Sequence, residues 1–157
     1  VNICLMVLTA DCVPVLLYDP KCRVIAAVHA GWRGTEANIV GKTVKLFREL
    51  YGSDPGDILA GIGPSIGKCC FEVGEEVAKA FQSQYSGQVE EGKNPGKYQV
   101  DLGGINSLQL QEAGVEAGHI EQAGICTMCH PHDFFSFRYA GLAAGRFGTG
   151  IFLRENP

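Results

Sequence analysis

The sequence lacks the features that mark membrane and exported proteins. In its 157 residues no apolar run approaches the roughly 20 residues of a membrane-spanning helix, and no signal peptide is visible. A strong excess of charge is absent too, because 13 basic and 17 acidic side chains leave a net charge of −4. This balance argues against nucleic acid or an anionic membrane as the main partner. We therefore expect a cytoplasmic protein with neither kind of partner.

A regular disulfide framework is also missing. The seven cysteines are odd in number and irregularly spaced, and Cys69 and Cys70 are adjacent. Secreted disulfide scaffolds carry an even number of cysteines, so we expect these thiols to be free or bound to metal in a reducing compartment. A starting Met is absent as well, and residues 3–8 read as a core-like strand with no lead-in. We expect one domain over residues 1–157 that lacks its N-terminal segment.

Two apolar, β-branched runs at residues 13–18 and 24–29 predict neighbouring strands. Between them, Asp19 followed by Pro20 is typical of a type I turn, in which Pro takes the position that needs φ near −65°. A hairpin centred between Pro20 and Lys21 pairs residues whose numbers sum to 41.

This register makes Cys12 and His29 direct neighbours across the two strands. Directly opposed Cβ atoms lie about 4.5–5.5 Å apart, which lets a thiol and an imidazole form a nucleophile–base pair or hold one metal ion. The alternative is a buried cysteine packed beside a histidine, with no chemical role. Pro14 favours an edge strand or a bulge, and a bulge would shift the register.

Three amphipathic segments predict helices. The first has Thr35 as its N-terminal cap and ends at Gly52, after apolar residues at helical spacing. The second covers residues 73–85. The third begins after the capping residue Asp101, with Leu108 as its clearest core residue.

The order of strands and helices indicates the fold class. Further strands are expected at residues 58–62, 98–100, 118–125 and 149–153. Together with the hairpin, they predict an α+β fold: a layered α/β sandwich around one mixed sheet that contains the antiparallel hairpin. No internal repeat and no linker divides the chain.

The residues just after the second strand are candidates for ligand binding. Trp32 offers a flat stacking surface, and Arg33 offers a forked anion-binding group near the start of a helix. The alternatives are a core tryptophan and a surface ion pair. Asp11 points to the opposite face of the strand from Cys12, and it could orient Arg33 or a capping amide, or it could be a turn residue. The sequence leaves that choice open.

A second group of candidates lies in residues 126–145, a segment dense in Cys, His, Phe and Arg. Phe135, Arg138 and the following Arg146, together with Arg33, could line a pocket for an aromatic base that carries an anionic group. The alternative is that the phenylalanines are core residues and the arginines are solvated.

The run C-T-M-C-H from Cys126 to His130 matches the short pattern of covalent haem attachment. We reject that interpretation, because such attachment belongs to exported proteins and the sequence shows no export signal. A zinc knuckle would need a second pair of ligands at suitable spacing. Cys69 and Cys70 are adjacent and do not form a CxxC pair, so a zinc knuckle is only weakly indicated.

Four motifs occur in a fixed order along the chain: T-A-D-C-V-P-V-L, V-H-A-G-W-R-G-T, G-I-G-P-S-I-G-K-C-C-F-E-V, and C-T-M-C followed by F-F-S-F-R. In these motifs the sequence resembles the YfiH/YlmD family, formerly described as multicopper polyphenol oxidoreductases or laccases. The resemblance covers almost the whole chain. It implies a layered α/β fold likened to that of cytotoxic-factor deamidases, which also use a Cys–His pair.

The resemblance also implies chemistry on purine nucleosides. Family members are described as phosphorolysing adenosine, inosine, guanosine and methylthioadenosine and as deaminating adenosine, and a bacterial member as editing peptidoglycan precursors. Their metal site consists of two His and one Cys that hold zinc or, in older accounts, copper. Cys12 and His29 match the last two ligands by motif, and the first His would lie upstream of Val1.

We therefore predict a purine nucleoside phosphorylase with adenosine deaminase activity, whose partners are a purine nucleoside and phosphate. Cys12, His29 and Asp11 are the predicted catalytic residues, with Cys12 and His29 as ligands of zinc or, less favoured, copper. The remaining predicted contacts to substrate or phosphate are Arg33, Trp32, Arg138, Arg146 and Phe135.

Other functions stay open at this point. A metal-free Cys–His hydrolase or amidase would use Cys12 as nucleophile and His29 as base, for example in editing peptidoglycan precursors. A copper-dependent polyphenol oxidase fits less well, because laccase chemistry needs several His-rich copper sites and the chain has four His. A metal-binding protein without catalysis is a further alternative.

Overall fold

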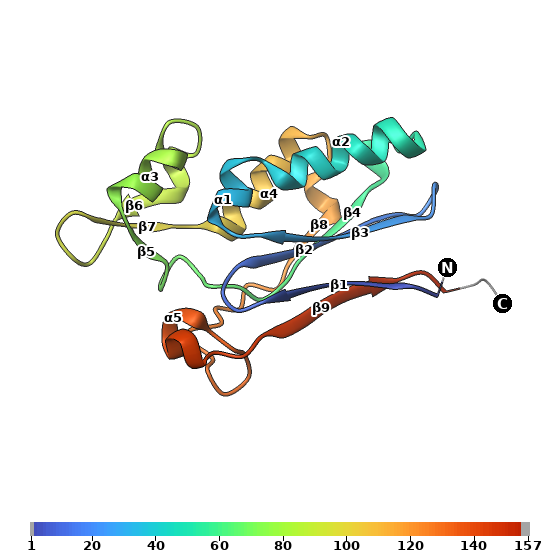
Figure 1. Ribbon diagram of the computed structural model, residues 1–157. Coiled ribbons are helices and arrows are strands. Elements are labelled where there is room, and N and C mark those ends of the chain that lie inside the picture. Colours follow the sequence, from blue (N-terminus) through green and yellow to red (C-terminus); the bar gives the residue numbers. More distant parts are fainter. Residues whose placement is uncertain (1, 155–157) are drawn as a thin grey trace.

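The computed structural model describes residues 2–154 and arranges them as three β-sheets, with most of the helices on one side and the helix at residues 137–140 on the other (Figure 1). The largest sheet has the strand order β3-β2-β4-β8, in which β4 and β8 are parallel and the other pairs antiparallel. This mixed sheet with its antiparallel hairpin confirms the predicted α+β class. Its strands are β2 (Val13–Asp19), β3 (Val24–Ala30), β4 (Leu59–Ile62) and β8 (Ile120–Gln122).

Two smaller sheets accompany the largest one, whereas the sequence predicted a single sheet. β1 pairs antiparallel with β9 below the central sheet in Figure 1, and β7 lies between β5 and β6. Strand β1 also lacks its predicted core-like character, because Met6 and Leu8 are 59% and 57% exposed. The strands of these sheets are β1 (Cys4–Thr9), β9 (Phe147–Phe152), β5 (Glu72–Gly74), β6 (Val89–Glu91) and β7 (Lys97–Val100).

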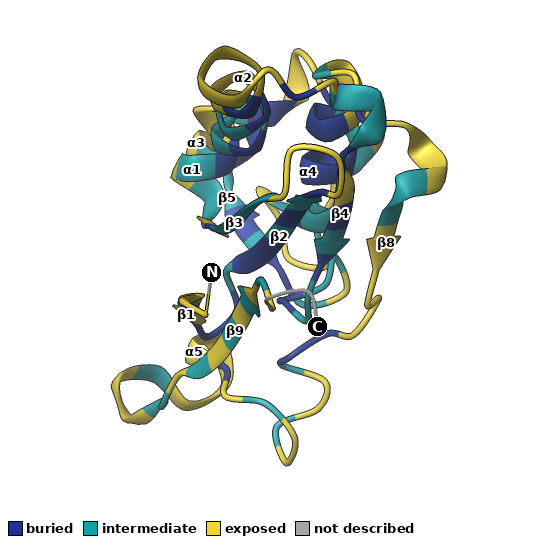
Figure 2. Cartoon of the chain, turned by 90° about the vertical axis from the view of Figure 1, so that its right-hand side faces the viewer, coloured by how far each residue is buried: buried dark blue, intermediate teal, exposed yellow. Residues whose placement is uncertain are grey.

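The core lies between the central sheet and the helices above it in Figure 1. Buried residues, dark blue in Figure 2, concentrate on β2 and on the inner faces of α2 and α4. Leu108, the predicted core residue of α4, is only partly buried, because this helix turns Ile105 and Leu110 inward instead. None of the helices in residues 2–154 is long and apolar enough to cross a membrane. They are α1 (Trp32–Glu36), α2 (Ile39–Tyr51), α3 (Glu75–Gln82), α4 (Leu102–Glu112) and α5 (Phe137–Ala140).

The first predicted helix is divided into α1 and α2. Asn38, with a left-handed φ of 53°, caps the start of α2, where its side chain accepts a hydrogen bond from the Gly41 N–H at 3.0 Å. The predicted cap, Thr35, is instead buried, and its hydroxyl accepts a hydrogen bond from α4. Gly52 ends α2 as predicted. The predicted second helix starts later than expected, because residues 72–74 form β5.

The turn between β2 and β3 is longer than predicted. It holds four residues between the paired Asp19 and Val24. The Asp19 carboxylate accepts hydrogen bonds from the backbone N–H groups of Lys21 and Cys22 at 2.7 and 2.9 Å, so the turn closes around this side chain. Arg23 then takes a left-handed φ of 54° before β3 begins.

This longer turn changes which residues face each other across the hairpin. Paired residue numbers sum to 43, so Pro14 lies opposite His29, and the prediction that Cys12 does so is wrong. The change in the sum is two, and side chains along a strand alternate between faces with a period of two. Continued to Cys12, this register therefore keeps Cys12 and His29 on the same face, as diagonal neighbours.

The left-handed cap at Asn38 gives a direct test of the break between α1 and α2. Asn38→Ala removes the hydrogen bond from Gly41. It also leaves a residue with a β-carbon, but without a local hydrogen bond, in the left-handed region. We therefore expect the free energy of unfolding to fall by about 2 kcal/mol. Asn38→Gly tolerates this backbone conformation and is the matched control, with a much smaller loss. Urea unfolding measures both variants, and equal stability of the two would contradict the left-handed backbone at residue 38.

Candidate functional site

A pocket of about 360 Å³ opens where the end of β3 meets the segment before β2. This volume lies within the roughly 300–1,000 Å³ of small-ligand pockets. Its lining combines residues from separate parts of the sequence, and it includes five of the predicted site residues: Asp11, Cys12, His29, Arg138 and Arg146. The lining is completed by Ala10, Ile66, Phe71 and Phe137.

Cys12 and His29 lie together on the wall of this pocket. The Sγ atom of Cys12 is 3.1 Å from the position that a β-carbon on Gly31 would take, so the glycine after β3 leaves room for the thiol. His29 belongs to β3 and is exposed. The pair offers a sulfur and an imidazole nitrogen, which are donors that zinc and copper both bind.

The surroundings of Cys12 disfavour its thiolate form. Burial raises the pKa of the Cys12 thiol above its ordinary value, the neighbouring Asp11 carboxylate raises it further, and Arg146 offsets only part of the two effects. With no bound cation, Cys12 is therefore protonated at neutral pH and is a weak nucleophile. A metal ion would change this state, because a thiol that coordinates a metal loses its proton.

Asp11 fastens the segment before β2 to the segment that follows β8. Its carboxylate accepts hydrogen bonds from the Thr127 hydroxyl at 2.7 Å and from the backbone N–H of Arg138 at 2.6 Å. The residue is buried, has a left-handed φ of 85°, and accepts the Ile66 N–H on its backbone carbonyl. Of the roles that the sequence left open for Asp11, the structure shows the contact with a capping amide: its carboxylate accepts the Arg138 N–H in the first turn of α5. We call this arrangement of Asp11, Thr127 and Arg138 the Asp11 clasp.

The two pocket arginines are held by backbone carbonyls. Nη1 of Arg138 donates to the Glu72 carbonyl at 2.8 Å, and the guanidinium lies 5.4 Å from the centre of the Phe71 ring. Nη1 of Arg146 donates at 2.9 and 2.8 Å to the carbonyls of the two residues that precede it. A guanidinium has five N–H donors, so each arginine keeps donors that can bind an anion in the pocket.

Three predicted binding residues lie outside the lining of this pocket. The Arg33 guanidinium is 4.2 Å from the centre of the Trp32 ring, and Trp32 packs against the core, in line with the core alternative for this residue. Phe135 is 51% exposed, and its ring covers Gly145, where a β-carbon would come within 2.8 Å of ring atoms. Phe71, which sequence reasoning missed, does line the pocket. Its place in the C-C-F-E-V part of a family motif was the available signal.

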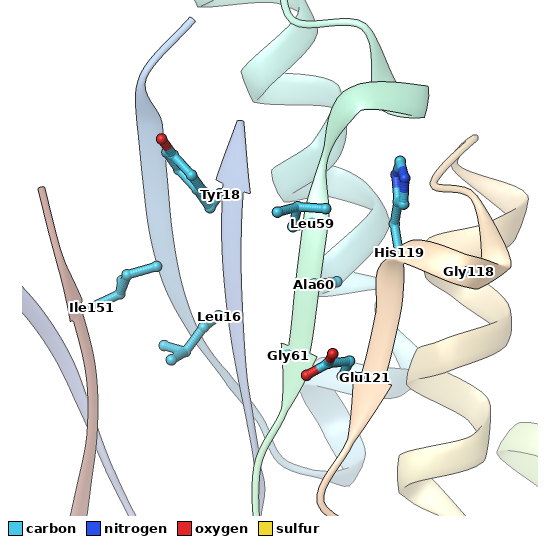
Figure 3. Close-up of a pocket in the computed structure, with 9 residues that line it drawn as sticks. All are labelled: Leu16, Tyr18, Leu59, Ala60, Gly61, Gly118, His119, Glu121 and Ile151. Atoms are coloured by element: carbon cyan, nitrogen blue, oxygen red, sulfur yellow. The ribbon is translucent and has the colours of Figure 1, made fainter. Parts of the chain in front are cut away.

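A second cavity, of about 290 Å³, lies on the central sheet (Figure 3). Side chains of β2 and β4, such as Leu16 and Leu59, form its floor, with Ile151 of β9 on one side and His119 and Glu121 on the other. None of the predicted site residues lines it. Of these two cavities, only the pocket around Cys12 and His29 is lined by predicted site residues.

Four cysteines from distant parts of the sequence come together beside that pocket. The Sγ atoms of Cys69, Cys70, Cys126 and Cys129 all lie within 4.8 Å of one another, a spacing that could hold a metal ion. From the sequence a zinc knuckle is only weakly indicated, because Cys69 and Cys70 are adjacent and do not form a CxxC pair. Tertiary contacts bring the two pairs together, and spacing along the chain does not reveal such contacts. Among residues 2–154, no comparable group of three or more Cys, His, Asp or Glu includes the two pocket donors.

The sequence matches, over residues 1–154, the family described as multi-copper polyphenol oxidoreductase laccase. The chain belongs to this family, and the resemblance drawn from its four motifs is confirmed. It is 46% identical over 158 residues to a purine nucleoside phosphorylase of Bacteroides thetaiotaomicron, an alignment that covers 97% of this chain and 57% of the relative. It is also 40% identical over 150 residues to adenosine deaminase RL5 of an unknown prokaryotic organism. That alignment covers 93% of this chain and 56% of the relative.

A solved structure shares the fold. The crystal structure of the hypothetical protein YfiH from Bacillus licheniformis matches with a TM-score of 0.93 at 36% sequence identity. The match covers 98% of this chain and 58% of that chain. This chain therefore spans little more than half the length of these two relatives and of this solved structure.

The Asp11 clasp predicts the effect of one buried hydroxyl group. Thr127→Val removes the hydrogen bond to the Asp11 carboxylate at similar side-chain volume, so we expect the free energy of unfolding to fall by about 1.5–3 kcal/mol, the range for hydrogen bonds to charged groups. Thr127→Ser keeps the hydroxyl and loses a methyl group worth about 0.8 kcal/mol, which makes it the matched control. Urea unfolding measures both, and a Thr127→Val protein at least as stable as the Thr127→Ser protein would contradict the role of this bond.

Proposed function

We propose that the pocket around Cys12 and His29 is the active site of a purine nucleoside phosphorylase that accepts adenosine, inosine, guanosine or methylthioadenosine. The observation that carries this proposal is the convergence of a thiol, an imidazole, two guanidinium groups and two aromatic rings on one cavity. The name of the Bacteroides thetaiotaomicron relative supports the reaction type. Because this chain covers 57% of that relative, the activity is proposed for a protein of the family's full length.

The pocket lining suits both parts of the reaction. Phe71 and Phe137 supply aromatic rings on which a purine base can stack. Arg138 and Arg146 supply guanidinium groups, whose planar set of donors matches phosphate oxygens. Since backbone carbonyls already hold both arginines, less conformational entropy is lost when phosphate binds.

Phosphorolysis needs phosphate to be held beside the sugar. An oxygen of inorganic phosphate forms a bond to C1′ of the ribose while the bond from C1′ to the purine nitrogen breaks. The electron pair of that bond goes to the purine, which takes up a proton, and the sugar leaves as ribose 1-phosphate. In this proposal Arg138 and Arg146 orient the phosphate. Because phosphate and nucleoside are then bound next to each other, the loss of translational and rotational entropy occurs on binding and not in the chemical step. Asp11 is a positioning residue, because the clasp occupies both of its carboxylate oxygens.

In this proposal Cys12 and His29 hold a zinc ion. Catalytic zinc takes three protein ligands from Cys, His and acidic residues, so this thiol and this imidazole fit as two of the three. When bound, the ion supplies a Lewis acid and a water whose pKa is near 7. Copper binds the same donor types, but oxidase chemistry needs several His-rich sites, and of the four His in the chain His29 alone lines this pocket.

Adenosine deamination is a second candidate activity of the same pocket, and the likeness to adenosine deaminase RL5 favours it. In that reaction water adds to the purine carbon that carries the amino group, and ammonia leaves. Phosphate is not consumed. Product analysis therefore separates the two activities, since adenosine gives inosine by deamination and adenine with ribose 1-phosphate by phosphorolysis.

Turnover of a full-length protein tests the proposal. With inosine and phosphate, we expect Cys12→Ser and His29→Ala to lower kcat/KM at least about 100-fold, the scale on which groups that stabilise charge in an active site act. Cys22→Ser changes an exposed cysteine in the hairpin turn and is the matched control, with unchanged turnover. Chromatography of hypoxanthine and ribose 1-phosphate measures the reaction. Full activity in both pocket variants would refute the proposed site.

The reactivity of Cys12 distinguishes this proposal from a metal-free Cys–His hydrolase, such as one that edits peptidoglycan precursors. The raised pKa of the Cys12 thiol predicts slow alkylation at pH 7 and faster alkylation as the pH rises, because the thiolate is the reactive form. Zinc is expected to slow the labelling further by occupying the sulfur. Peptide mapping after iodoacetamide treatment measures the labelling, with exposed Cys22 as the internal reference. Fast labelling at pH 7 that zinc leaves unchanged would favour the hydrolase.

A further inference from the structure

We propose that a second, structural zinc ion binds to four thiolates beside the pocket. The ligands, which we call the four-cysteine site, are Cys69, Cys70, Cys126 and Cys129. They come from two loops, residues 63–71 between β4 and β5 and residues 123–136 between β8 and α5. This inference goes beyond the proposed function and does not depend on it, because no step of that reaction uses these thiols.

The sulfur atoms already have the spacing of ligands to a single small ion. The Sγ atom of Cys129 is 3.7 Å from that of Cys69 and 3.4 Å from that of Cys70, and all four sulfurs lie within 4.8 Å of one another. Zinc binds sulfur at about 2.3 Å, so the edge of a regular tetrahedron of sulfurs around it is about 3.8 Å. A disulfide would need sulfurs about 2.05 Å apart. The observed separations therefore match joint ligation better than pairwise oxidation.

The backbone around the four-cysteine site favours this grouping. The Gly67 N–H donates to the Sγ of Cys126 at 3.2 Å, and the Cys129 N–H closes a turn on the Cys126 carbonyl at 3.1 Å. A β-carbon on Gly67 would lie 3.1 Å from the Cβ of Cys126 and 3.3 Å from the Sγ of Cys69, so a side chain there would push the loops apart. An N–H group directed at a cysteine sulfur stabilises the thiolate that a metal requires.

The donor set selects the metal. Four sulfurs in a tetrahedral arrangement are typical of zinc or of an iron–sulfur cluster, whereas calcium and magnesium require oxygen ligands. An iron–sulfur cluster places several irons and sulfides between its cysteines and needs a wider separation than sulfurs within 4.8 Å allow. Cys69 and Cys129 are exposed, which gives an ion access to the site from solvent. A single zinc ion therefore fits best.

The four-cysteine site is connected directly to the Asp11 clasp. Thr127, which donates to Asp11, lies between two of the ligands in the sequence. Arg138 donates from Nη1 to the Glu72 carbonyl at 2.8 Å and, at 3.5 Å, to that of Cys70. Its positive charge offsets part of the negative charge of four thiolates. A zinc ion here would hold together the two loops that carry Thr127 and the pocket residues on the β4–β5 loop.

Metal analysis of a chain without the pocket thiol tests the proposal. We expect the Cys12→Ser protein to retain one zinc per chain, with four sulfur neighbours at about 2.3 Å in its zinc X-ray absorption spectrum. In that background, changing the two exposed ligands by Cys69→Ser and Cys129→Ser is expected to abolish zinc retention. The matched control, with Cys4→Ser and Cys22→Ser, changes two exposed cysteines elsewhere and is expected to retain the ion.

Several results would overturn the proposal. These are a Cys12→Ser protein without zinc, equal zinc content in the two double variants, iron or copper bound in place of zinc, or a disulfide among the four thiols in peptide maps made without reductant. Circular dichroism checks the folding of each variant. The X-ray absorption measurement leaves the four cysteines unchanged, so it decides the question even where a double variant does not fold. A zinc shell that contains mostly nitrogen or oxygen in the Cys12→Ser protein would refute the site.

Discussion

The buried carboxylate of Asp11 is the feature on which the pocket depends most. A buried charge is costly unless its oxygens are hydrogen-bonded, and here one oxygen accepts from the Thr127 hydroxyl and the other from the Arg138 backbone N–H. These bonds join residues 116 and 127 positions apart in the sequence. Because Asp11 directly precedes Cys12, the clasp also holds Cys12 in place relative to Arg138. The placement of the chemistry therefore relies on a tertiary contact as much as on the hairpin.

Strands and helix caps that depend on residues close together in the sequence could be predicted. The register in which the two strands of the hairpin pair could not. The β-branched runs form β2 and β3 where expected, and Asp101 caps α4 by accepting the Gly104 N–H at 2.8 Å. The hairpin register depends on turn length, which Asp19 extends by holding two N–H groups. The apolar pattern does not distinguish registers whose sums differ by two, because every side chain keeps its face. For the same reason, Cys12 and His29 share a pocket although they are not directly opposed.

The candidate site was predicted in part, and the misses have local causes. α1 begins at Trp32, almost directly after β3. There the Arg33 guanidinium stacks on the Trp32 ring, and neither residue lines the pocket. Phe135 precedes α5 and packs over Gly145, while Phe137, at the start of that helix, lines the pocket instead. The grouping of four cysteines was missed because it requires two loops, separated by more than fifty residues, to meet.

The central claim is zinc chemistry in a pocket that we propose accepts a nucleoside and phosphate, and it requires Cys12 and His29 to bind one ion together. Anomalous diffraction at the zinc absorption edge, from zinc-loaded crystals of the full-length protein, tests this requirement most directly. The predicted result is a peak about 2.3 Å from the Cys12 Sγ and about 2.0–2.1 Å from a ring nitrogen of His29. Zinc-loaded crystals without a peak within bonding distance of both residues would contradict the account.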